Sequence, residues 1–288
     1  MSNNILVTGS NGQLGSEIRD ISKSYNYNFF FTDKTTLDII SESEIKKFIN
    51  QNSIDTIINC AAYTAVDKAE QDPIHADDIN HLAVSYLARL AKIYDIKLIH
   101  ISTDYVFDGK NYKPYREDDA TNPDGVYGLS KLSGEKALLH VSPKNSIIIR
   151  TSWVYSSHGV NFVKTMLRLG KEQERLKVVF DQIGTPTYAK DLAKTIMNIL
   201  PKIENKKTEI YHYSNEGVCS WYDFAKEIMR MAKLTCRVVP ILTKEYPTPA
   251  KRPHYSVLDK SKIKKDFSIT IPYYKDSLDE CLKIIKKS

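Results

Sequence analysis

Three glycines near the start of the chain constrain its fold more than any other feature. Gly9, Gly12 and Gly15 follow an apolar segment, residues 5–8, that we predict to be a strand, and they lead into helical periodicity from about Gln13. Glycine lets a backbone approach a pyrophosphate, and the N-terminus of a helix favours the phosphate charge. The Gly-x-x-Gly-x-x-Gly spacing is one residue longer at the front than the commonest dinucleotide fingerprint. In this strand–turn–helix context the glycines predict a dinucleotide-binding loop, although glycine-rich turns also occur without one.

Short apolar runs alternate with helical patterns through the first 150 residues. Further strands are predicted at residues 29–32, 56–59, 98–102 and 147–150. Helices are predicted at residues 42–49, behind a capping box of Ser41 and Glu44, and at 73–94 and 127–140. Strands that alternate with helices predict an α/β fold with a doubly wound parallel sheet of the Rossmann type.

The rest of the chain is less regular. Strands are predicted near residues 178–180 and 210–213, and helices at 188–200, 220–231 and 277–286. We predict a smaller, discontinuous C-terminal lobe beside the sheet domain. Residues 1–155 and about 176–215 are assigned to the dinucleotide-binding domain, and about 156–175 and 216–288 to a substrate-binding lobe.

Composition points to an ordinary globular protein. The chain has 288 residues, of which 42% are hydrophobic and 26% charged, and a core of that size needs no disulfides or structural metal. The four cysteines are scattered, so we expect reduced thiols. A strand starts almost at once, which leaves no room for a signal peptide, and no apolar run approaches membrane-spanning length. We therefore expect a cytoplasmic protein without a membrane partner.

The net charge of +6 comes largely from lysines near the C-terminus. A solvated face of a terminal helix is the first interpretation, attraction of an anionic small substrate the second, and nucleic-acid binding a distant third. We expect no nucleic-acid partner.

Tyr127 and Lys131 form a Tyr-x-x-x-Lys pair, and Thr103 stands between this pair and the glycine loop in the sequence. Positions four apart share one face of a helix, so the phenol and the ammonium can point into one cleft. A nearby cation lowers the pKa of a phenol, and a tyrosine tuned in this way can protonate a carbonyl oxygen as hydride arrives at carbon. Thr103 ends a predicted strand, where ligands of open α/β sheets bind. The alternative for Thr103 is a turn cap.

Other candidate site residues also follow predicted strands. Asp33 is placed to bind ribose hydroxyls, which favours NADH, while Lys34 could hold a 2′-phosphate; a loop ion pair competes with both. Asp38 and Ile39 could flank the adenine, or Asp38 could be a helix-cap acid. The remaining candidates are Ala61, Ala62 and Tyr63, against the cofactor ribose or in tight packing, and Trp153, in the core or as a stacking wall for a sugar.

Longer motifs resemble one family, the dTDP-4-dehydrorhamnose reductases of the extended short-chain dehydrogenase/reductase superfamily. The resemblance covers nearly the whole chain. It is carried by residues 59–70 (NCAAYTAVDKAE), 102–109 (STDYVFDG), 126–135 (VYGLSKLSGE), 150–155 (RTSWVY), 181–187 (DQIGTPT) and 249–253 (PAKRP), with Ser256. It implies reduction of the 4-keto group of dTDP-4-dehydro-L-rhamnose to dTDP-L-rhamnose by NADPH or NADH.

The resemblance also implies roles for individual residues. Tyr127 would be the proton donor, and Lys131 would lower its pKa and hold the nicotinamide ribose. Thr103 and Asp104 would contact the substrate, Trp153 would line the sugar site, and Arg252 would suit the diphosphate. The implied cofactor contacts are Gly12, Gln13, Leu14, Asp38, Ile39, Ala61, Ala62 and Tyr63.

The sequence departs from the family pattern at one place. Some members join two subunits through a magnesium ion held by glutamates, and Glu17 matches one of those ligands. Lys190 stands where another would be, and the final helix offers no clear third ligand, although Glu280 is nearby. We predict that no metal is bound and that the protein is a monomer or a homodimer.

Other functions remain possible from sequence. A sugar-nucleotide dehydratase would share the fold, but relatives of that kind often carry Asp-Glu after Ser-Thr, and Asp104 is followed by Tyr105. Another nucleotide-sugar reductase or an epimerase is a further alternative. A regulatory subunit of methionine adenosyltransferase resembles the same family and acts by binding a partner enzyme.

Overall fold

A six-stranded sheet forms the centre of the molecule. The structure is a computed structural model that describes residues 3–287. All strand pairings in this sheet are parallel. In spatial order its strands are β10 (Glu209–His212), β5 (Ser146–Thr151), β4 (Lys97–Thr103), β3 (Thr56–Asn59), β1 (Asn4–Thr8) and β2 (Asn28–Phe31). The order reverses beside β1, so the predicted doubly wound sheet is confirmed.

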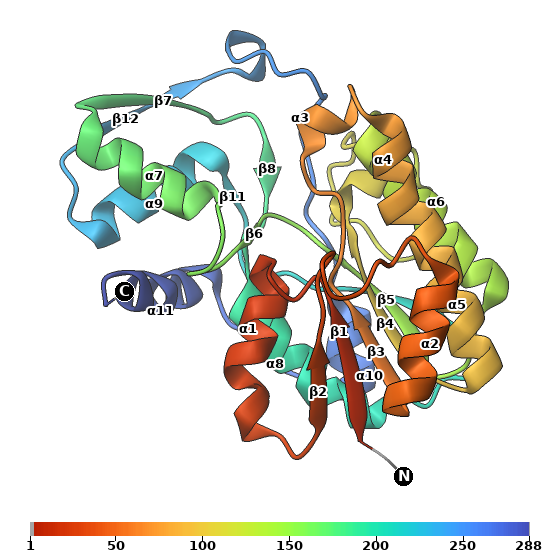
Figure 1. Cartoon of the computed structure of the whole chain (residues 1–288). Helices are drawn as coiled ribbons and strands as arrows, with labels where there is room; N and C mark the ends of the chain where they lie inside the picture. The colour runs from red at the N-terminus through yellow and green to blue at the C-terminus, as the bar shows by residue number, and fades with distance from the viewer. Residues whose placement is uncertain (1–2, 288) are drawn as a thin grey trace.

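Helices cover both faces of the sheet (Figure 1). Each helix buries an apolar stripe against the strands, as its periodicity predicts. One face is covered by α1 (Gln13–Ile21), α8 (Ala189–Ile199) and α10 (Ser261–Phe267). The other is covered by α2 (Glu42–Asn52), α5 (Ala83–Tyr94) and α6 (Val126–Val141). The catalytic candidates on β4 and α6 therefore belong to one three-layer α/β/α domain.

The start of α2 realises half of the predicted capping box. Ser41 Oγ accepts a hydrogen bond from the Glu44 backbone N–H at 3.4 Å, so Ser41 is the N-cap. The Glu44 carboxylate accepts instead from the backbone N–H of Asp38 at 3.3 Å. The glutamate thus fastens the loop before the helix rather than closing the box.

The long helix predicted over residues 73–94 is present but interrupted. It consists of α4 (Pro73–Asp77), a π-helical turn (Asp78–Leu82) and α5. A π-turn widens the helix by one residue and is frequent at functional sites. Here it buries Asn80 between the helix and α6. The short helix α3 (Val66–Ala69) precedes this assembly.

A second lobe, at the upper left of Figure 1, is built from separate chain segments. Its strands β7 (Arg175–Val179) and β12 (Arg237–Ile241) pair in parallel. Its helices are α7 (Phe162–Glu172), α9 (Trp221–Ala232) and α11 (Tyr274–Ile285). Two small strand pairs complete it: β6 (Val154–Tyr155) with β9 (Thr187–Tyr188), and β8 (Ile183–Gly184) with β11 (Cys219–Ser220).

Two segments lie elsewhere than predicted. Residues 176–179 were assigned to the sheet domain, but Leu176 and Val178 of β7 are buried in the core of the second lobe. Residues 261–267 were assigned to the lobe, but Ile263 and Phe267 of α10 pack on the core of the sheet domain. Hydrophobic periodicity identifies a strand or a helix, but it does not show which other element covers the apolar side of that strand or helix.

Several of the lysines near the C-terminus form ion pairs within the molecule. Lys260 and Lys264 ion-pair with Glu216, Lys262 pairs with Glu209, and Lys283 pairs with Asp279. Lys260 is buried, so the solvated-face interpretation does not hold for every lysine of this group.

All four cysteines are free thiols. Burial raises the pKa of the thiols of Cys60, Cys219 and Cys281 to about 12, so they stay protonated at neutral pH. Within residues 3–287, none of the helices combines the length and the apolar character needed to cross a membrane.

Candidate active site

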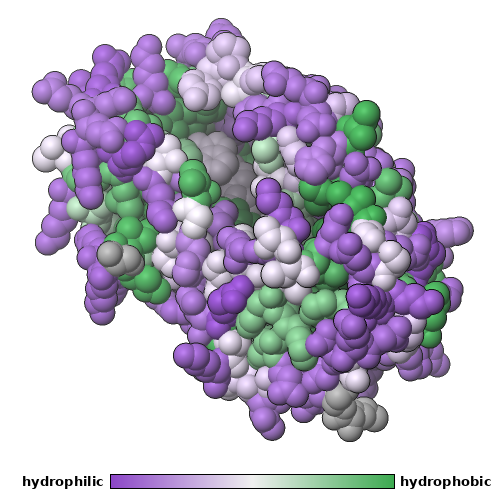
Figure 2. Space-filling model, viewed as in Figure 1, coloured by the Kyte–Doolittle hydropathy of each residue, from purple (hydrophilic) through white to green (hydrophobic). Residues whose placement is uncertain are grey.

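A cleft of about 920 Å³ opens at the carboxyl ends of the sheet strands, where the second lobe faces them. Figure 2 shows the recess between the two parts of the molecule. The structure brings most predicted site residues together in its lining: Gly9, Gly12, Gln13, Leu14, Asp33, Asp38, Ile39, Ala61, Ala62, Thr103, Asp104, Tyr127, Lys131 and Trp153. Gly15, Tyr63 and Arg252 are outside this lining, and their positions are described below.

The glycine loop has the backbone shape that a pyrophosphate needs. Gly9 has φ +62°, and a Cβ added there would lie 2.6 Å from the backbone nitrogen of Ala61. Gly12 is the N-cap of α1, so the unpaired N–H groups of the first turn are available to an anion. At Gly15 a Cβ would lie 2.6 Å from the Gly9 carbonyl oxygen, so this glycine serves helix packing. The loop fits a dinucleotide.

Asp33 lies two residues after β2 and lines the cleft where a ribose is expected to bind. Its Oδ1 accepts hydrogen bonds from the backbone N–H and the hydroxyl of Thr35, at 2.9 and 2.6 Å, and these bonds lower the pKa of the carboxyl. Its Oδ2 accepts from the side-chain amide of Asn11. Lys34 also lines the cleft. The carboxylate suits ribose hydroxyls and the lysine suits a 2′-phosphate, so this wall is compatible with either nicotinamide cofactor.

Tyr127 and Lys131 share the buried stripe of α6. The stripe continues through Ser130, Glu135 and Leu138, which follow the helical spacing. Lys131 is only 1% exposed. Its ammonium donates to the Ile101 carbonyl oxygen at 2.6 Å, and burial lowers the pKa of Lys131 to about 8.

The phenol of Tyr127 titrates in the opposite direction from the prediction. Burial raises the pKa of Tyr127 to about 12, although the hydroxyl of Thr103 acts to lower it. The expected lowering by Lys131 is wrong, because desolvation of the phenolate dominates and the ammonium donates to the Ile101 carbonyl oxygen instead. Tyr127 is therefore a neutral phenol with a proton to donate.

Asp104 places a carboxyl group on the floor of the cleft. It is 3% exposed, and its Oδ1 accepts from the Thr103 hydroxyl at 2.9 Å. Its Oδ2 is buried without a hydrogen bond of normal geometry from any residue in the range 3–287. Burial raises the pKa of Asp104 to about 6, against smaller lowering effects of Thr103 and Ser256. A buried, unpaired acceptor of this kind suits a hydroxyl of a bound molecule.

Two residues that support the site escaped the sequence prediction. Asn80 clamps the backbone of Tyr63, accepting from its N–H at 2.9 Å and donating to its carbonyl oxygen at 3.1 Å, and it also donates to Ser130. The Tyr105 ring packs edge-on against the Tyr127 ring at 5.4 Å. An asparagine within the apolar run of a predicted helix was the available signal for Asn80.

Aromatic rings form the wall on the side of the second lobe. Trp153 stacks on Trp221, with ring centroids 3.6 Å apart and planes inclined by 10°. Trp153 has φ +48°, an uncommon backbone conformation for a large residue. At Gly184 a Cβ would lie 2.6 Å from the Trp153 ring, so the indole is held from behind. Trp153 lines the cleft and also packs against the core of the second lobe.

Arg252 lies beside the cleft, near Tyr105. Its Nη2 forms an ion pair with Asp67 at 2.7 Å. Its Nη1 is buried, with no hydrogen-bond partner in the described part of the chain. A guanidinium with one free face suits an additional anion.

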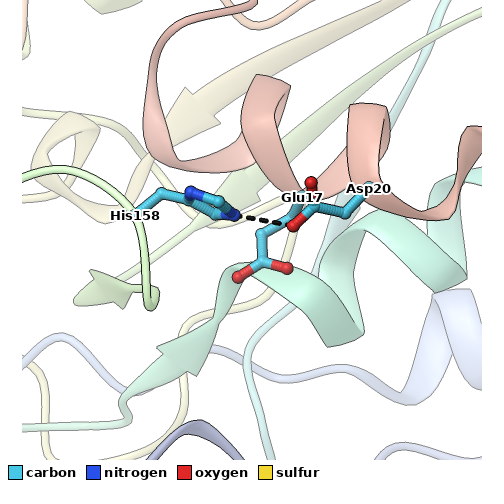
Figure 3. A group of neighbouring side chains, drawn as sticks. All are labelled: Glu17, Asp20 and His158. Atoms are coloured by element: carbon cyan, nitrogen blue, oxygen red, sulfur yellow. Dashed lines mark hydrogen bonds and ion pairs between the residues drawn. The ribbon is translucent and has the colours of Figure 1, made fainter. Parts of the chain in front are cut away.

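The residues at the metal-ligand positions that the resemblance implies form hydrogen bonds and ion pairs with neighbouring side chains. Glu17 and Asp20 of α1 lie beside His158, and the candidate ligand atoms of the three are within 4.8 Å of one another (Figure 3). His158 Nε2 contacts Asp20 at 2.7 Å, and Glu17 accepts from Ser156 Oγ at 2.5 Å. Lys190 forms an ion pair with Glu280 at 2.8 Å. Burial raises the pKa of Glu17, against smaller lowering effects of Ser156, His158 and Lys190, and the absence of a bound magnesium ion stays a prediction.

Comparisons with known proteins agree on one family. Residues 3–287 match the family model described as RmlD substrate binding domain. A dTDP-4-dehydrorhamnose reductase of Aggregatibacter actinomycetemcomitans is 44% identical over 92% of this chain and 93% of its own. The crystal structure of such a reductase from Clostridium acetobutylicum matches with a TM-score of 0.94 at 41% identity, covering 98% of this chain and 99% of that one. Another, from Bacillus anthracis in complex with NADP, matches with a TM-score of 0.94 at 37% identity, covering 99% and 100%.

Proposed function

This chain belongs to the dTDP-4-dehydrorhamnose reductase family, and we propose on that basis that it reduces the 4-keto group of dTDP-4-dehydro-L-rhamnose to give dTDP-L-rhamnose. The cofactor is NADPH or NADH, which supplies the hydride when bound. One observation carries the proposal: Thr103, Tyr127 and Lys131 line the same cleft as the glycine loop. The reaction belongs to nucleotide-sugar biosynthesis.

The residues of the chain divide the remaining work. The neutral phenol of Tyr127 gives its proton to the carbonyl oxygen, and Thr103 shares the hydrogen bonding of that oxygen. Asp104 Oδ2 accepts from a sugar hydroxyl, and the Trp153 ring forms the wall beside the sugar. The free face of Arg252 binds the diphosphate. Burial of Tyr127 and Lys131 keeps water away from the proton transfer.

Turnover of defined sugar nucleotides tests this proposal. Loss of reduced-nicotinamide absorbance is followed with dTDP-4-dehydro-L-rhamnose and with keto-sugar nucleotides that differ in the base or the sugar, with NADPH and NADH in parallel. The expected result is the highest kcat/KM with the dTDP-rhamnose precursor and a product of the mass of dTDP-L-rhamnose. Turnover confined to a different sugar nucleotide would point to another reductase. Absence of turnover with every member would favour the regulatory-subunit alternative.

The compartment and the assembly are parts of the same proposal. We place the reaction in the cytoplasm. The free thiols of the protein suit a reducing compartment, and the same compartment supplies the nicotinamide cofactor. A monomer or a homodimer is expected, with the dTDP-sugar as the partner molecule.

Arg252→Ala should raise the KM for the dTDP-sugar roughly 10- to 100-fold with little change in kcat, since a charge-assisted hydrogen bond is lost away from the reacting carbon. Steady-state kinetics with varied sugar nucleotide measure the effect. Lys251→Ala is the matched control, because Lys251 is the adjacent cation and its pair with Asp124 is more exposed. An unchanged KM in Arg252→Ala would remove this residue from diphosphate binding.

Lys131→Met should lower kcat by about 10² and weaken cofactor binding. The alkaline limb of the pH–rate profile should also move upward, because titration of Lys131 near pH 8 disappears and Tyr127 titrates only near 12. Lys136→Met, on an exposed position of the same helix, is the control. A profile and a cofactor Kd equal to those of the unmodified protein would make Lys131 merely structural.

Chelation should leave activity intact, and added magnesium should change it little. The reason is the Lys190–Glu280 ion pair, which puts a cation at an expected anionic ligand position. Turnover and sedimentation are measured with and without EDTA. The prediction concerns metal dependence, so a dimer that persists in EDTA is compatible with it. Dissociation together with loss of activity in EDTA, both reversed by magnesium, would contradict it.

A further inference from the structure

A row of polar side chains crosses the sheet directly behind Lys131. Thr8 on β1 is the register partner of Asn59 on β3, and Asn59 is the register partner of His100 on β4. None of the three is more than 1% exposed. Two residues before each of them, on the same face of the sheet, lie the apolar Leu6, Ile57 and Leu98. Three polar groups in such surroundings require mutual hydrogen bonds.

The hydrogen bonds run in one line to the catalytic lysine. The Thr8 hydroxyl lies 2.6 Å from Asn59 Oδ1, and Asn59 Nδ2 lies 3.0 Å from His100 Nδ1. At the end of the line, His100 Nε2 lies 3.4 Å from Lys131 Nζ. Burial and the Lys131 charge hold the pKa of His100 well below its usual value, so the imidazole is neutral and carries a single hydrogen. That hydrogen sits on either Nδ1 or Nε2, and the choice propagates along the line.

The hydrogen bonds of this row can point in either of two directions, and only the Asn59 amide has to turn over. With Asn59 Nδ2 donating to Nδ1, the hydrogen is on Nε2, and Nε2–H can donate only to a neutral Lys131 amine. If the Asn59 amide turns over, Nδ1–H donates to its oxygen, and Nε2 becomes an acceptor for the Lys131 ammonium. The ammonium thus matches only the arrangement with Nδ1–H, whereas the arrangement with Nε2–H requires the neutral amine.

We propose that His100 is a positioning residue for Lys131, whose imidazole lets this buried amine lose and regain a proton by reversing the hydrogen bonds of the Thr8–Asn59–His100 row. The proposal rests on the reductase function. When Tyr127 gives its proton to the substrate oxygen, the phenolate is reprotonated from the Lys131 ammonium, and the resulting amine later takes a proton from solvent. The reversal keeps the amine and the imidazole hydrogen-bonded in both states, so Nζ stays at the Ile101 carbonyl.

Other charged groups near the row do not compete for this role. Glu135 of α6 favours the charged form of Lys131, but its carboxylate is bound by Arg150 of β5 and by Ser102 of β4. From α5, the apolar Val84 and Leu87 pack on this face of the sheet. Lys131 is therefore the titrating group that faces His100, and the tautomer of His100 should follow its charge.

Nitrogen NMR of ligand-free protein with 15N-labelled histidine tests the reversal without substrate or cofactor. The expected result is a change of the His100 tautomer from Nδ1–H to Nε2–H as the pH passes the pKa of Lys131, about 8, and no change in Lys131→Met. His212 is an internal control, since its Nδ1 faces the Tyr115 carbonyl oxygen at 3.1 Å and must keep its hydrogen throughout. A His100 tautomer that stays constant across this pH range would overturn the proposal whatever the protein reduces.

Kinetics provide a second test in the active enzyme. His100→Leu should move the alkaline limb of the pH–rate profile to lower pH by roughly one unit, the size expected when an ammonium loses a hydrogen bond. His100→Gln should restore most of this shift, because an amide can both donate and accept. Equal shifts in the two variants would show that His100 acts through packing alone and would also overturn the proposal.

Discussion

Tyr127→Phe is expected to lower kcat by about 10²–10⁴ and to leave the cofactor Kd nearly unchanged. Loss of general-acid help has that size, and the phenol is the neutral donor in the cleft, with a pKa raised to about 12 by burial. Phenylalanine keeps the ring that packs against Tyr105, so the shape of the cleft is preserved. Steady-state turnover and calorimetric titration of the cofactor measure the two quantities.

A matched control separates the phenol from the loss of a tyrosine in general. Tyr86→Phe makes the same substitution on α5, where Tyr86 lies against Arg89 and away from the lining of the cleft. Its kcat should equal that of the unmodified protein. A Tyr127→Phe variant with near-normal kcat would exclude Tyr127 as the proton donor, and an altered cofactor Kd would assign it a binding role.

Arg150→Met is expected to lower the free energy of unfolding by about 3–5 kcal/mol, the usual effect of breaking a buried ion pair. Arg150 and Glu135 are 3% and 0% exposed, and their charged groups lie 2.7 Å apart. The substitution leaves the Glu135 carboxylate in the core with Ser102 as its remaining donor. A domain is stable by only about 5–15 kcal/mol, so this loss should be evident in a urea titration.

Exposure distinguishes this pair from others of the same chemistry. Arg168→Met breaks the Arg168–Glu172 pair, whose side chains are 61% and 53% exposed, and should change stability by less than about 0.5 kcal/mol. The double variant Arg150→Met/Glu135→Leu should recover much of the lost stability, because no charge remains buried. Loss of less than about 1 kcal/mol in Arg150→Met would contradict the assignment of this pair as a buried charge network.

Local patterns predicted the sheet domain and most of the lining of the cleft. The strand, the glycines and the following helix at residues 4–21 fold as predicted, since their interactions lie within a short stretch of chain. Tyr127 and Lys131 share a face because helix geometry alone places positions four apart together. Thr103 and Ala61 line the cleft because parallel strands present their carboxyl ends at one edge.

The same local patterns could not predict contacts between residues far apart in the sequence. A strand was predicted near residues 178–180, but the observed strand, residues 175–179, pairs with residues 237–241, some sixty residues away. Arg252 was predicted near the diphosphate, and its ion pair with Asp67 joins parts of the chain 185 residues apart. The helical period does not predict the π-turn at Asp78–Leu82, in which Asn80 is buried against Ser130 of α6.

By itself, the sequence determined the order of strands and helices, the dinucleotide loop and the Tyr–Lys pair, because each depends on neighbours within a few turns or strands. Only the tertiary structure decided how those groups titrate and what supports them. Burial, which arises from the whole core, raises the pKa of Tyr127 where the neighbouring cation alone would lower it. Strand register, which is set across the sheet, aligns Thr8, Asn59 and His100 behind Lys131, although 51 and 41 residues separate successive members.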